Sequence, residues 1–287
     1  MTILELKRHF KNALSERYTE AESAQIFTIF FYEKTGLDRF QQRRFSHQEI
    51  LKSDEEEFLS LIEQLKSGKP YQQVLGHTEF FKLKFLVNEH VLIPRPETEE
   101  LLEIIISEIS SHLKNKNISS VSNLKILDIG TGSGVIPIVL KKKFPKAKVF
   151  ALDVSKEALK IAKQNAEIHK AEIEFIEADY LNTELSENFD IIISNPPYIG
   201  KEEQHEIHES VKDFEPNIAL FSPTKDALIF YRKIAKDCSE HLREEGMFLL
   251  EINQKLGQET LDLFKNFSEK KLLKDLSDND RFVIGRK

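Results

Sequence analysis

From residue 124 onward, short apolar segments alternate with amphipathic ones, and this alternation is the strongest constraint on the fold. The short segments, rich in Ile, Leu, Val and Phe, have the composition of buried strands, and the segments between them have the spacing of helices. Such an alternation predicts an α/β domain with a doubly wound, mostly parallel sheet and helices on both faces. The expected strands are 124–129, 148–153, 173–179, 189–194 and 247–252, the expected helices are 135–143, 156–170, 226–242 and 256–267, and the segments 271–276 and 281–286 follow the last helix.

Residues 1–69 have helical spacing instead. Apolar residues recur there at intervals of three and four, which predicts a small helical bundle. Gly68 and Pro70 are expected to end its last helix. The three apolar stripes are Leu4, Leu6, Phe10 and Leu14; Ile26, Ile29 and Phe30; and Ile50, Phe58, Leu59, Ile62 and Leu65.

From Gly76 the apolar period changes to an alternating one, which predicts a hairpin. Phe81 to Val87 supply the alternation, and Val91, Leu92 and Ile93 follow it. Pro94 and Pro96 then stop the strand, a helix is expected over 97–113, and a polar loop over 114–123. The predicted organisation is a helical domain over 1–70, a hairpin linker over 71–96 and the α/β domain over 97–287.

Composition narrows the classes of function. The single cysteine, Cys238, excludes a disulfide framework and a cysteine-rich zinc cluster. No apolar stretch reaches membrane-spanning length, and the first residues resemble neither a signal nor a transit peptide, so a cytoplasmic protein is expected. The net charge is −7, and residues 1–85 carry as many acidic as basic residues. The absence of a basic domain disfavours a nucleic-acid binder, although local basic patches stay open.

A glycine-rich motif follows the strand 124–129 and opens the next helix. This is where a parallel sheet binds nucleotide-like ligands, because glycines allow a tight turn and a close approach to the ligand. The motif is GxGxG and therefore lacks the GxGxxG spacing of a dinucleotide site and the Gly-Lys-Ser/Thr of a P-loop, so it favours a ligand with an amino-acid tail. A tight turn without ligand is the alternative. The motif is Asp128, Ile129, Gly130, Thr131, Gly132, Ser133 and Gly134.

Acidic residues end the next two strands. Asp153 is placed to accept both hydroxyl protons of a ribose. The alternative role, capping the helix after residue 155, is one that Ser155 can take instead. Asp179 and Tyr180 follow the third strand, where an acid and an aromatic ring could flank an adenine.

Asn195, Pro196, Pro197 and Tyr198 follow the strand 189–194 and therefore lie at the same edge as the glycine loop. Two prolines fix the backbone, which can direct the Asn195 side-chain oxygen and the Pro196 carbonyl into a pocket. Two acceptors fit an NH₂ group, and the Tyr198 ring can stack on a flat amide or base. This arrangement suits methyl transfer to a planar amide or amino nitrogen by alignment, with no metal and no dedicated base. A rigid structural turn is the alternative.

With these motifs the sequence resembles the release-factor glutamine-N5 methyltransferases over nearly its whole length. The segments that carry the resemblance are GKPYQQVLGHTEFF (68–81), LIPRPETEEL (92–101), NPPYI (195–199), DFEP (213–216) and DNDRFVIGR (278–286). The resemblance implies a class I methyltransferase core with a seven-stranded sheet, preceded by a helical domain that recognises the substrate and a hairpin linker. It leaves two roles open for Arg95 and Glu97. They could close over the cofactor, or they could cap the helix and pack at the hinge.

The resemblance also implies the ligands and their residues. Gly130, Thr131, Gly132, Ser133, Gly134, Asp153, Tyr180 and Asn195 would bind S-adenosyl-L-methionine. Asn195, Pro196, Pro197 and Tyr198 would hold the substrate, with Asn195, Pro196 and Tyr198 as the catalytic set. The implied substrate is the glutamine of the Gly-Gly-Gln motif in class 1 peptide-chain release factors, with no membrane partner and no direct sequence-specific binding of nucleic acid.

Two other functions remain open at this stage. An adenine or guanine amino methyltransferase would share the Asn-Pro-Pro-Tyr loop, because a base amino group is also a flat NH₂, but it would need a basic channel or a means of flipping the base. A non-catalytic adaptor with a methyltransferase fold would tend to lose one of the two loops, and both are intact.

Overall fold

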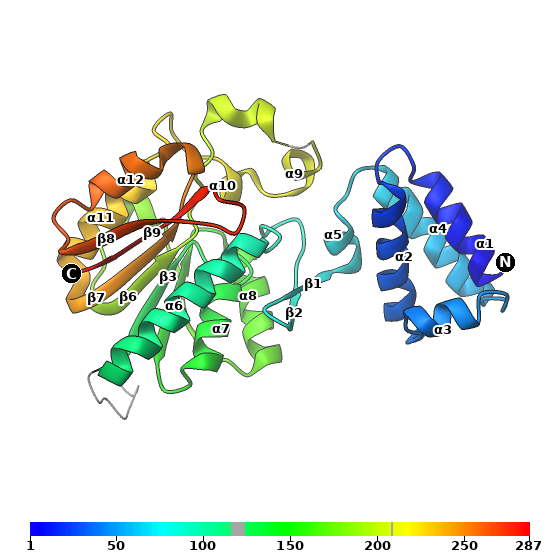
Figure 1. Cartoon of the computed structure of the whole chain (residues 1–287), viewed down its shortest axis with the longest axis horizontal. Coiled ribbons are helices and arrows are strands. Elements are labelled where there is room, and N and C mark those ends of the chain that lie inside the picture. Colours follow the sequence, from blue (N-terminus) through cyan, green and yellow to red (C-terminus); the bar gives the residue numbers. More distant parts are fainter. Residues whose placement is uncertain (116–123, 208) are drawn as a thin grey trace. The chain divides into compact units, whose positions relative to one another are not determined.

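The computed structural model describes residues 1–115, 124–207 and 209–287. The loop predicted over 114–123 falls largely outside these residues, and its first two residues belong to a helix. The chain divides into two compact units, Met1–Gly76 with His208–Phe214 and His77–Ile207 with Glu215–Lys287 (Figure 1). Across the described ranges, no helix has both the length and the apolar character needed to cross a membrane.

The first unit is a helical bundle with an aromatic core. The three expected helices are α1 (Ile3–Ala13), α2 (Glu20–Thr35) and α4 (Lys52–Lys66). Thr2 and Thr19 begin α1 and α2 with capping boxes, in which a threonine hydroxyl and a glutamate three residues later each accept a backbone N–H. Four rings from these helices pack together with centroids 5.4 to 5.8 Å apart: Phe10, Phe27, Phe31 and Phe58.

Two short helices in the N-terminal part of this unit were not expected from the apolar pattern. Helix α3 (Arg39–Arg44) begins at Asp38, whose carboxylate accepts the Gln41 N–H. Helix α5 (Tyr71–Leu75) follows Pro70 and ends at a glycine. The residues at their ends set where both helices begin and end. Both have too few turns for a helical spacing of apolar residues to be recognised in the sequence. Helix α9 (Glu209–Phe214) belongs to the same unit, since Gln73 donates its side-chain N–H to the Phe214 carbonyl.

The second unit begins with the hairpin of β1 (His77–Phe80) and β2 (Leu83–Leu86). A hairpin was predicted, but the expectation that Val91 to Ile93 would extend it is wrong. That segment forms no strand, and Ile93 donates its N–H to the buried carboxylate of Glu215. The turn consists of Phe81 and Lys82, both at positive φ (51° and 59°). The Glu99 carboxylate accepts the Phe81 N–H and holds this unfavourable turn in place.

The sheet has seven strands in the order β5-β4-β3-β6-β7-β9-β8, and only the pairs that involve β9 are antiparallel. This confirms the predicted doubly wound, mostly parallel class I architecture. The strands are β3 (Lys125–Ile129), β4 (Lys148–Asp153), β5 (Glu174–Glu177), β6 (Phe189–Ser194), β7 (Leu242–Glu251), β8 (Glu269–Lys274) and β9 (Asp280–Arg286).

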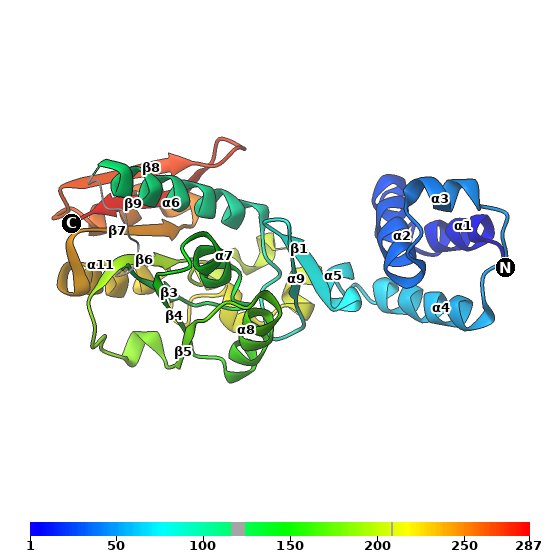
Figure 2. The same ribbon diagram turned by 90° about the horizontal axis from the view of Figure 1, so that it is seen from below.

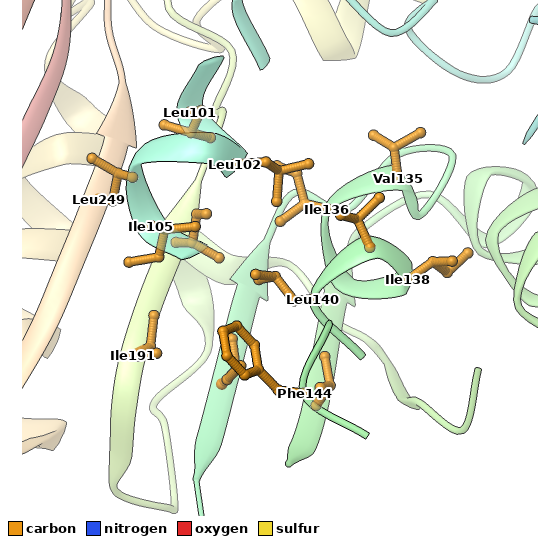
Figure 3. Close-up of a cluster of buried hydrophobic side chains, with 14 of the residues drawn as sticks. Leu101, Leu102, Ile105, Val135, Ile136, Ile138, Leu140, Phe144, Ile191 and Leu249 are labelled. Carbon is orange, nitrogen blue, oxygen red and sulfur yellow. The ribbon is translucent and has the colours of Figure 1, made fainter. Parts of the chain in front are cut away.

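Helices cover both faces of the sheet (Figures 1 and 2). Helices α6 (Pro96–Asn115), α7 (Val135–Lys143) and α8 (Lys156–His169) lie on one face, and α11 (Ile229–His241) and α12 (Gly257–Leu263) lie on the other. Side chains of α6 and α7 meet Ile191 and Leu249 of the sheet in the first core, which Figure 3 shows. Neighbouring strand residues enter the second core, so the central strands are apolar on both sides.

Smaller elements join these parts. Helix α10 (Asn217–Leu220) and the 3₁₀ turns η1 (Tyr180–Asn182), η2 (Lys201–Glu206) and η3 (Gln254–Leu256) were not predicted. Helix α11 begins later than expected, at Ile229, because Asp226 accepts the Leu228 N–H and closes a turn there. Cys238 is fully buried on α11, and burial raises the pKa of its thiol.

The strand β9 has no room for a side chain at Gly285, which lies opposite Phe248. A Cβ atom there would come 2.4 Å from the Phe248 ring and 2.8 Å from the Glu269 carbonyl oxygen. We predict that Gly285→Ala lowers the free energy of unfolding by about 1–3 kcal/mol in urea denaturation, as overpacking does. Gly200→Ala is the control, because the atom nearest to its Cβ would be the Glu203 Oε1 atom at 3.2 Å, at the end of a side chain. Equal losses in the two variants would contradict the prediction.

Candidate active site

A cavity lies at the carboxyl edge of the sheet, in the second unit. Its walls are the loop after β3, the end of β4, the residues before α6 and the loop after β6. Because β4 lies on one side of β3 and β6 on the other, the chain order reverses at this point, where open α/β sheets bind their ligands. The cavity has a volume of about 1010 Å³ when the open space at its mouth is included.

The glycine loop forms one wall. Gly130, Gly132 and Gly134 all have positive φ (76°, 53° and 81°), a conformation that other residues adopt only with strain. The loop is held from behind, because the Leu152 carbonyl accepts the N–H groups of Gly130 and Thr131. The structure places Gly130, Thr131, Gly132 and Ser133 at the cavity. Gly134 is not part of its lining: a Cβ there would come 3.1 Å from the Cβ of Ala162 on α8, so this glycine lets two helices approach.

Beneath the loop, the motif's first residue is fully buried. Asp128 does not line the cavity, and burial raises the pKa of its carboxyl to about 7, with the nearby Thr131 hydroxyl opposing the shift.

Asp153 lies at the cavity wall at the end of β4. Its carboxylate accepts the Gly132 N–H with one oxygen (2.8 Å) and the Ser155 N–H with the other (2.9 Å). Ser155 begins α8 and accepts the Ala158 N–H, so the capping role falls to Ser155. Each oxygen of Asp153 keeps acceptor capacity for a ligand hydroxyl. Burial raises the pKa of this carboxyl.

Asp179 and Tyr180 line the cavity beyond β5. The Tyr180 hydroxyl points away from it and donates to Asp237 (2.7 Å) inside the second core. Burial and the Asp237 charge raise the pKa of Tyr180, so the phenol stays neutral and the ring is what a ligand meets. Asp179 uses its carboxylate to hold the turn η1, accepting from Leu181 and Asn182.

The loop after β6 forms the opposite wall, with Asn195, Pro196 and Pro197 at the cavity. The backbone of the preceding residue is fixed because the Ser194 hydroxyl donates to the Ile129 carbonyl (2.7 Å). Tyr198 is partly buried and is not part of the cavity lining; its ring packs against the second core. The structure therefore brings together three parts of the predicted site: the glycine loop, Asp153 and residues 195–197 of the Asn-Pro-Pro-Tyr loop.

Two residues that contact this loop, Thr98 and Glu251, were missed by sequence reasoning, and Thr98 also lines the cavity. Asn195 donates its side-chain N–H to the Thr98 hydroxyl (3.2 Å), and Thr98 donates to a carboxylate oxygen of Glu251 (2.9 Å). Tyr198 donates its hydroxyl to the other Glu251 oxygen at 3.4 Å. Signals for both residues were present: Thr98 lies within LIPRPETEEL, and Glu251 is an acid at the end of the apolar strand β7.

Arg95 lines the cavity and forms an ion pair with Glu215 (2.6 Å). The Glu215 side chain is 1% exposed and also accepts the Ile93 N–H. The pair joins two segments that carry the family resemblance, LIPRPETEEL and DFEP. These contacts fit a packing role for Arg95 at the entrance to α6, and its place in the cavity lining is compatible with closure over the cofactor.

The lining residues fit S-adenosylmethionine. A nucleoside needs a hydroxyl acceptor and apolar walls, and the cavity offers Asp153 together with Ile129, Leu152, Ala158 and Phe230. An amino-acid tail needs a close approach to backbone, which Gly130 and Gly132 allow. The carboxyl edge of the sheet thus suits the three parts of this cofactor: ribose, adenine and methionine.

The fold and the cavity define a class I, S-adenosylmethionine-dependent methyltransferase. Residues 108–214 match the family model described as "Methyltransferase small domain". The chain belongs to the family of release factor glutamine methyltransferases. It is 45% identical to the protein of that name from Flavobacterium psychrophilum over 99% of this chain and 98% of the relative, and 39% identical to the one from Streptococcus pneumoniae over the same shares.

A solved structure supports the fold alone. The catalytic domain of hMettl16, crystallised with a 3′UTR hairpin, superposes with a TM-score of 0.52 at 15% identity and covers 79% of each chain.

Loss of the Asp153 carboxylate should weaken cofactor binding. Charge-assisted hydrogen bonds contribute roughly 1.5–3 kcal/mol, so we predict that Asp153→Ala raises the dissociation constant of S-adenosylmethionine at least about tenfold in calorimetry. The control is Asp262→Ala on the exposed surface of α12. An unchanged constant in Asp153→Ala would rule out Asp153 as a ribose acceptor.

Proposed function

We propose that this chain transfers a methyl group from S-adenosylmethionine to the side-chain amide nitrogen of the glutamine in the Gly-Gly-Gln motif of class 1 release factors. The observation that carries the proposal is the Asn195-Pro196-Pro197-Tyr198 loop, which lies at the edge of a cofactor-sized cavity in a chain 45% identical to a protein named for this reaction. Because release factors act in translation, we place the protein in the cytoplasm.

The chemistry of the loop fits a carboxamide. Asn195 and Pro196 each offer an oxygen acceptor, and a glutamine NH₂ group has two N–H donors. Accepting both protons would hold the nitrogen in place with its lone pair toward the cofactor and stabilise the positive charge that develops on it. We assign the catalytic roles to Asn195 and Pro196 on this basis. Tyr198, which the sequence also suggested as a catalytic residue, lies outside the cavity lining, so we assign it the role of anchoring the end of the loop through its hydrogen bond to Glu251.

When bound, S-adenosylmethionine supplies an electrophilic methyl group on a sulfonium. The residues of this chain supply alignment and exclusion of water. No base among them is required, because an amide nitrogen that gains a methyl group becomes strongly acidic and its proton leaves to water. The Tyr198 phenol cannot act as a base near neutral pH, since burial and the Glu251 charge raise its pKa.

We predict that the acceptor is the loop glutamine. Purified release factor, total RNA and DNA are each incubated with tritiated cofactor, and the release factor with its loop glutamine changed to alanine is the matched control. Label should appear only in the release factor that keeps its loop glutamine. Label in nucleic acid would favour the nucleobase alternative, and label in the glutamine-less factor would show a different acceptor.

Asn195→Ala should abolish turnover, because the lost interaction matters most in the transition state. The dissociation constant of the cofactor should stay within a few-fold of the wild-type value. Single-turnover methylation gives the rate, and calorimetry gives the binding. A normal single-turnover rate would remove Asn195 from the mechanism. Label transfer by the wild-type chain would argue against a non-catalytic adaptor.

We also propose that the helical unit recognises the release factor, and its surface suggests where. A hollow over α1 and α3 is lined by five cationic side chains: Lys7, Arg8, Lys11, Arg39 and Arg43. Burial, Arg39 and Arg43 lower the pKa of Lys7, so these positive charges converge. The equal numbers of acidic and basic residues within 1–85 conceal this separation of charge. An acidic surface of the release factor is the occupant that complements the hollow.

Reversing one charge in the hollow should weaken recognition of the intact protein only. We predict that Arg43→Glu raises KM for the release factor several-fold, more at low salt than at high salt, with little change in cofactor binding. Lys52→Glu, an exposed residue of the same unit outside the hollow, is the control. Equal KM values for the two variants would place the docking surface elsewhere, and a selective loss of RNA binding in Arg43→Glu would identify a different partner.

A further inference from the structure

The hydrogen bonds behind Asn195 form a chain that ends on a buried carboxylate. The Asn195 Nδ2 group, the Thr98 hydroxyl and the Glu251 carboxylate follow one another at 3.2 and 2.9 Å. Thr98 and Glu251 are only 3% and 2% exposed. The three residues come from the loop after β6, from α6 and from the end of β7, so the fold itself brings them together.

The chain has a direction that the chemistry of its members fixes. An ionised carboxylate only accepts, so the single Thr98 proton points to Glu251. The Thr98 oxygen is then left as an acceptor, and it can bind only the NH₂ side of the Asn195 amide. Tyr198 donates to the second Glu251 oxygen. The carboxylate is thus linked to both ends of the loop, directly to Tyr198 and through Thr98 to Asn195.

The consequence falls on the other side of the Asn195 amide. Its Oδ1 atom receives no hydrogen bond from any residue the structure describes, and Asn195 lines the cavity. If the amide were rotated by half a turn, its NH₂ group would face the substrate NH₂, and two donors would meet without an acceptor. Buried donors without an acceptor are costly, so the direction of the amide decides whether the loop can hold a carboxamide.

We infer that Thr98 and Glu251 are positioning residues that set the orientation of the Asn195 amide and so present its oxygen to the substrate nitrogen. The inference rests on the proposed function, because it assigns the acceptor role of Oδ1. Neither residue touches the substrate in this scheme. Both act through Asn195, and Glu251 also acts through Tyr198.

The surroundings of Glu251 support this role. Burial raises the pKa of its carboxyl to about 7, the hydrogen bond from Thr98 and the charge of Arg281 lower it, and the charge of Glu97 raises it. Arg281 of β9 is itself paired with Asp275 (3.0 Å), and Tyr231 of α11 donates to the Glu251 backbone carbonyl. A protonated Glu251 can donate to Thr98 and reverse the chain. We therefore expect protonation of Glu251, as pH falls through about 7, to weaken its control over the Asn195 orientation.

The test compares single-turnover methylation of purified release factor by full-length variants. Thr98→Val removes the hydroxyl and keeps the shape. We expect a rate about tenfold to a hundredfold lower, comparable to loss of one transition-state hydrogen bond, with cofactor affinity and the KM for release factor changed less than about threefold. Thr98→Ser keeps the hydroxyl and should restore most of the rate. The matched control is Thr260→Val, because the buried Thr260 hydroxyl has no hydrogen-bond partner in the described structure and lies on α12. It should leave the rate unchanged.

The pH profile gives a second readout that a purely structural role would not move. The wild-type rate should rise as pH increases through about 7, the pKa of Glu251, and Glu251→Gln should be slower and lack this rise. This variant also keeps the inference testable if Thr98→Val fails to fold. If Thr98→Val matches Thr260→Val while Asn195→Ala is inactive, or if Glu251→Gln keeps the wild-type profile, the inference is wrong and the proposed function stands. If Asn195→Ala is active, the proposed function fails first.

Discussion

The parallel pairing of β3 with β6 is the interaction on which the rest of the site depends. It sets Ile129 beside Ser194, so the glycine loop and the Asn-Pro-Pro-Tyr loop leave the sheet at the same level. The Ser194 hydroxyl links the two strand ends by donating a hydrogen bond to the Ile129 carbonyl. The loops also lie close together, since a Cβ at Gly130 would lie 3.9 Å from the Asn195 carbonyl oxygen. A shift of register by one residue would exchange the two faces of a strand and separate the two loops. The position of the chemistry is therefore fixed by backbone hydrogen bonds between two strands that are 65 residues apart along the chain.

Much of the fold follows from local pattern, because central parallel strands are apolar on both faces. The strands 148–153 and 189–194 are thus visible in the sequence through the apolar runs 149–152 and 191–193. Since the carboxyl ends of parallel strands share one edge, the meeting of the glycine loop, Asp153 and Asn195 was predictable as well. Sheet order was not predictable from local pattern, and neither were the short helices α3 and α10, which are too short to show a period. The segment after Val91 was misassigned because its apolar residues pack without forming a strand; a distant carboxylate, Glu215, satisfies its backbone.

What sequence reasoning missed at the site lies at long range. Thr98 and Glu251 are separated by 153 residues and meet only because α6 and β7 pack together. A buried carboxylate is expensive unless its oxygens receive hydrogen bonds, and Glu251 receives them from Thr98 and Tyr198. These hydrogen bonds oppose the rise that burial causes in the pKa of Glu251, which lies next to the Asn-Pro-Pro-Tyr loop. The cationic hollow of the helical unit was not predictable for a different reason. The number of charged residues does not show which face of the unit they occupy.

The β1–β2 turn has a consequence for the order in which the chain folds. Two-residue hairpins form readily by themselves when asparagine and glycine occupy the turn, because those residues tolerate positive φ. Here Phe81 and Lys82 occupy it, so the turn has little intrinsic stability, and its backbone N–H is held by Glu99 of α6. The hairpin is therefore a late-forming element that needs a formed α6 as its template.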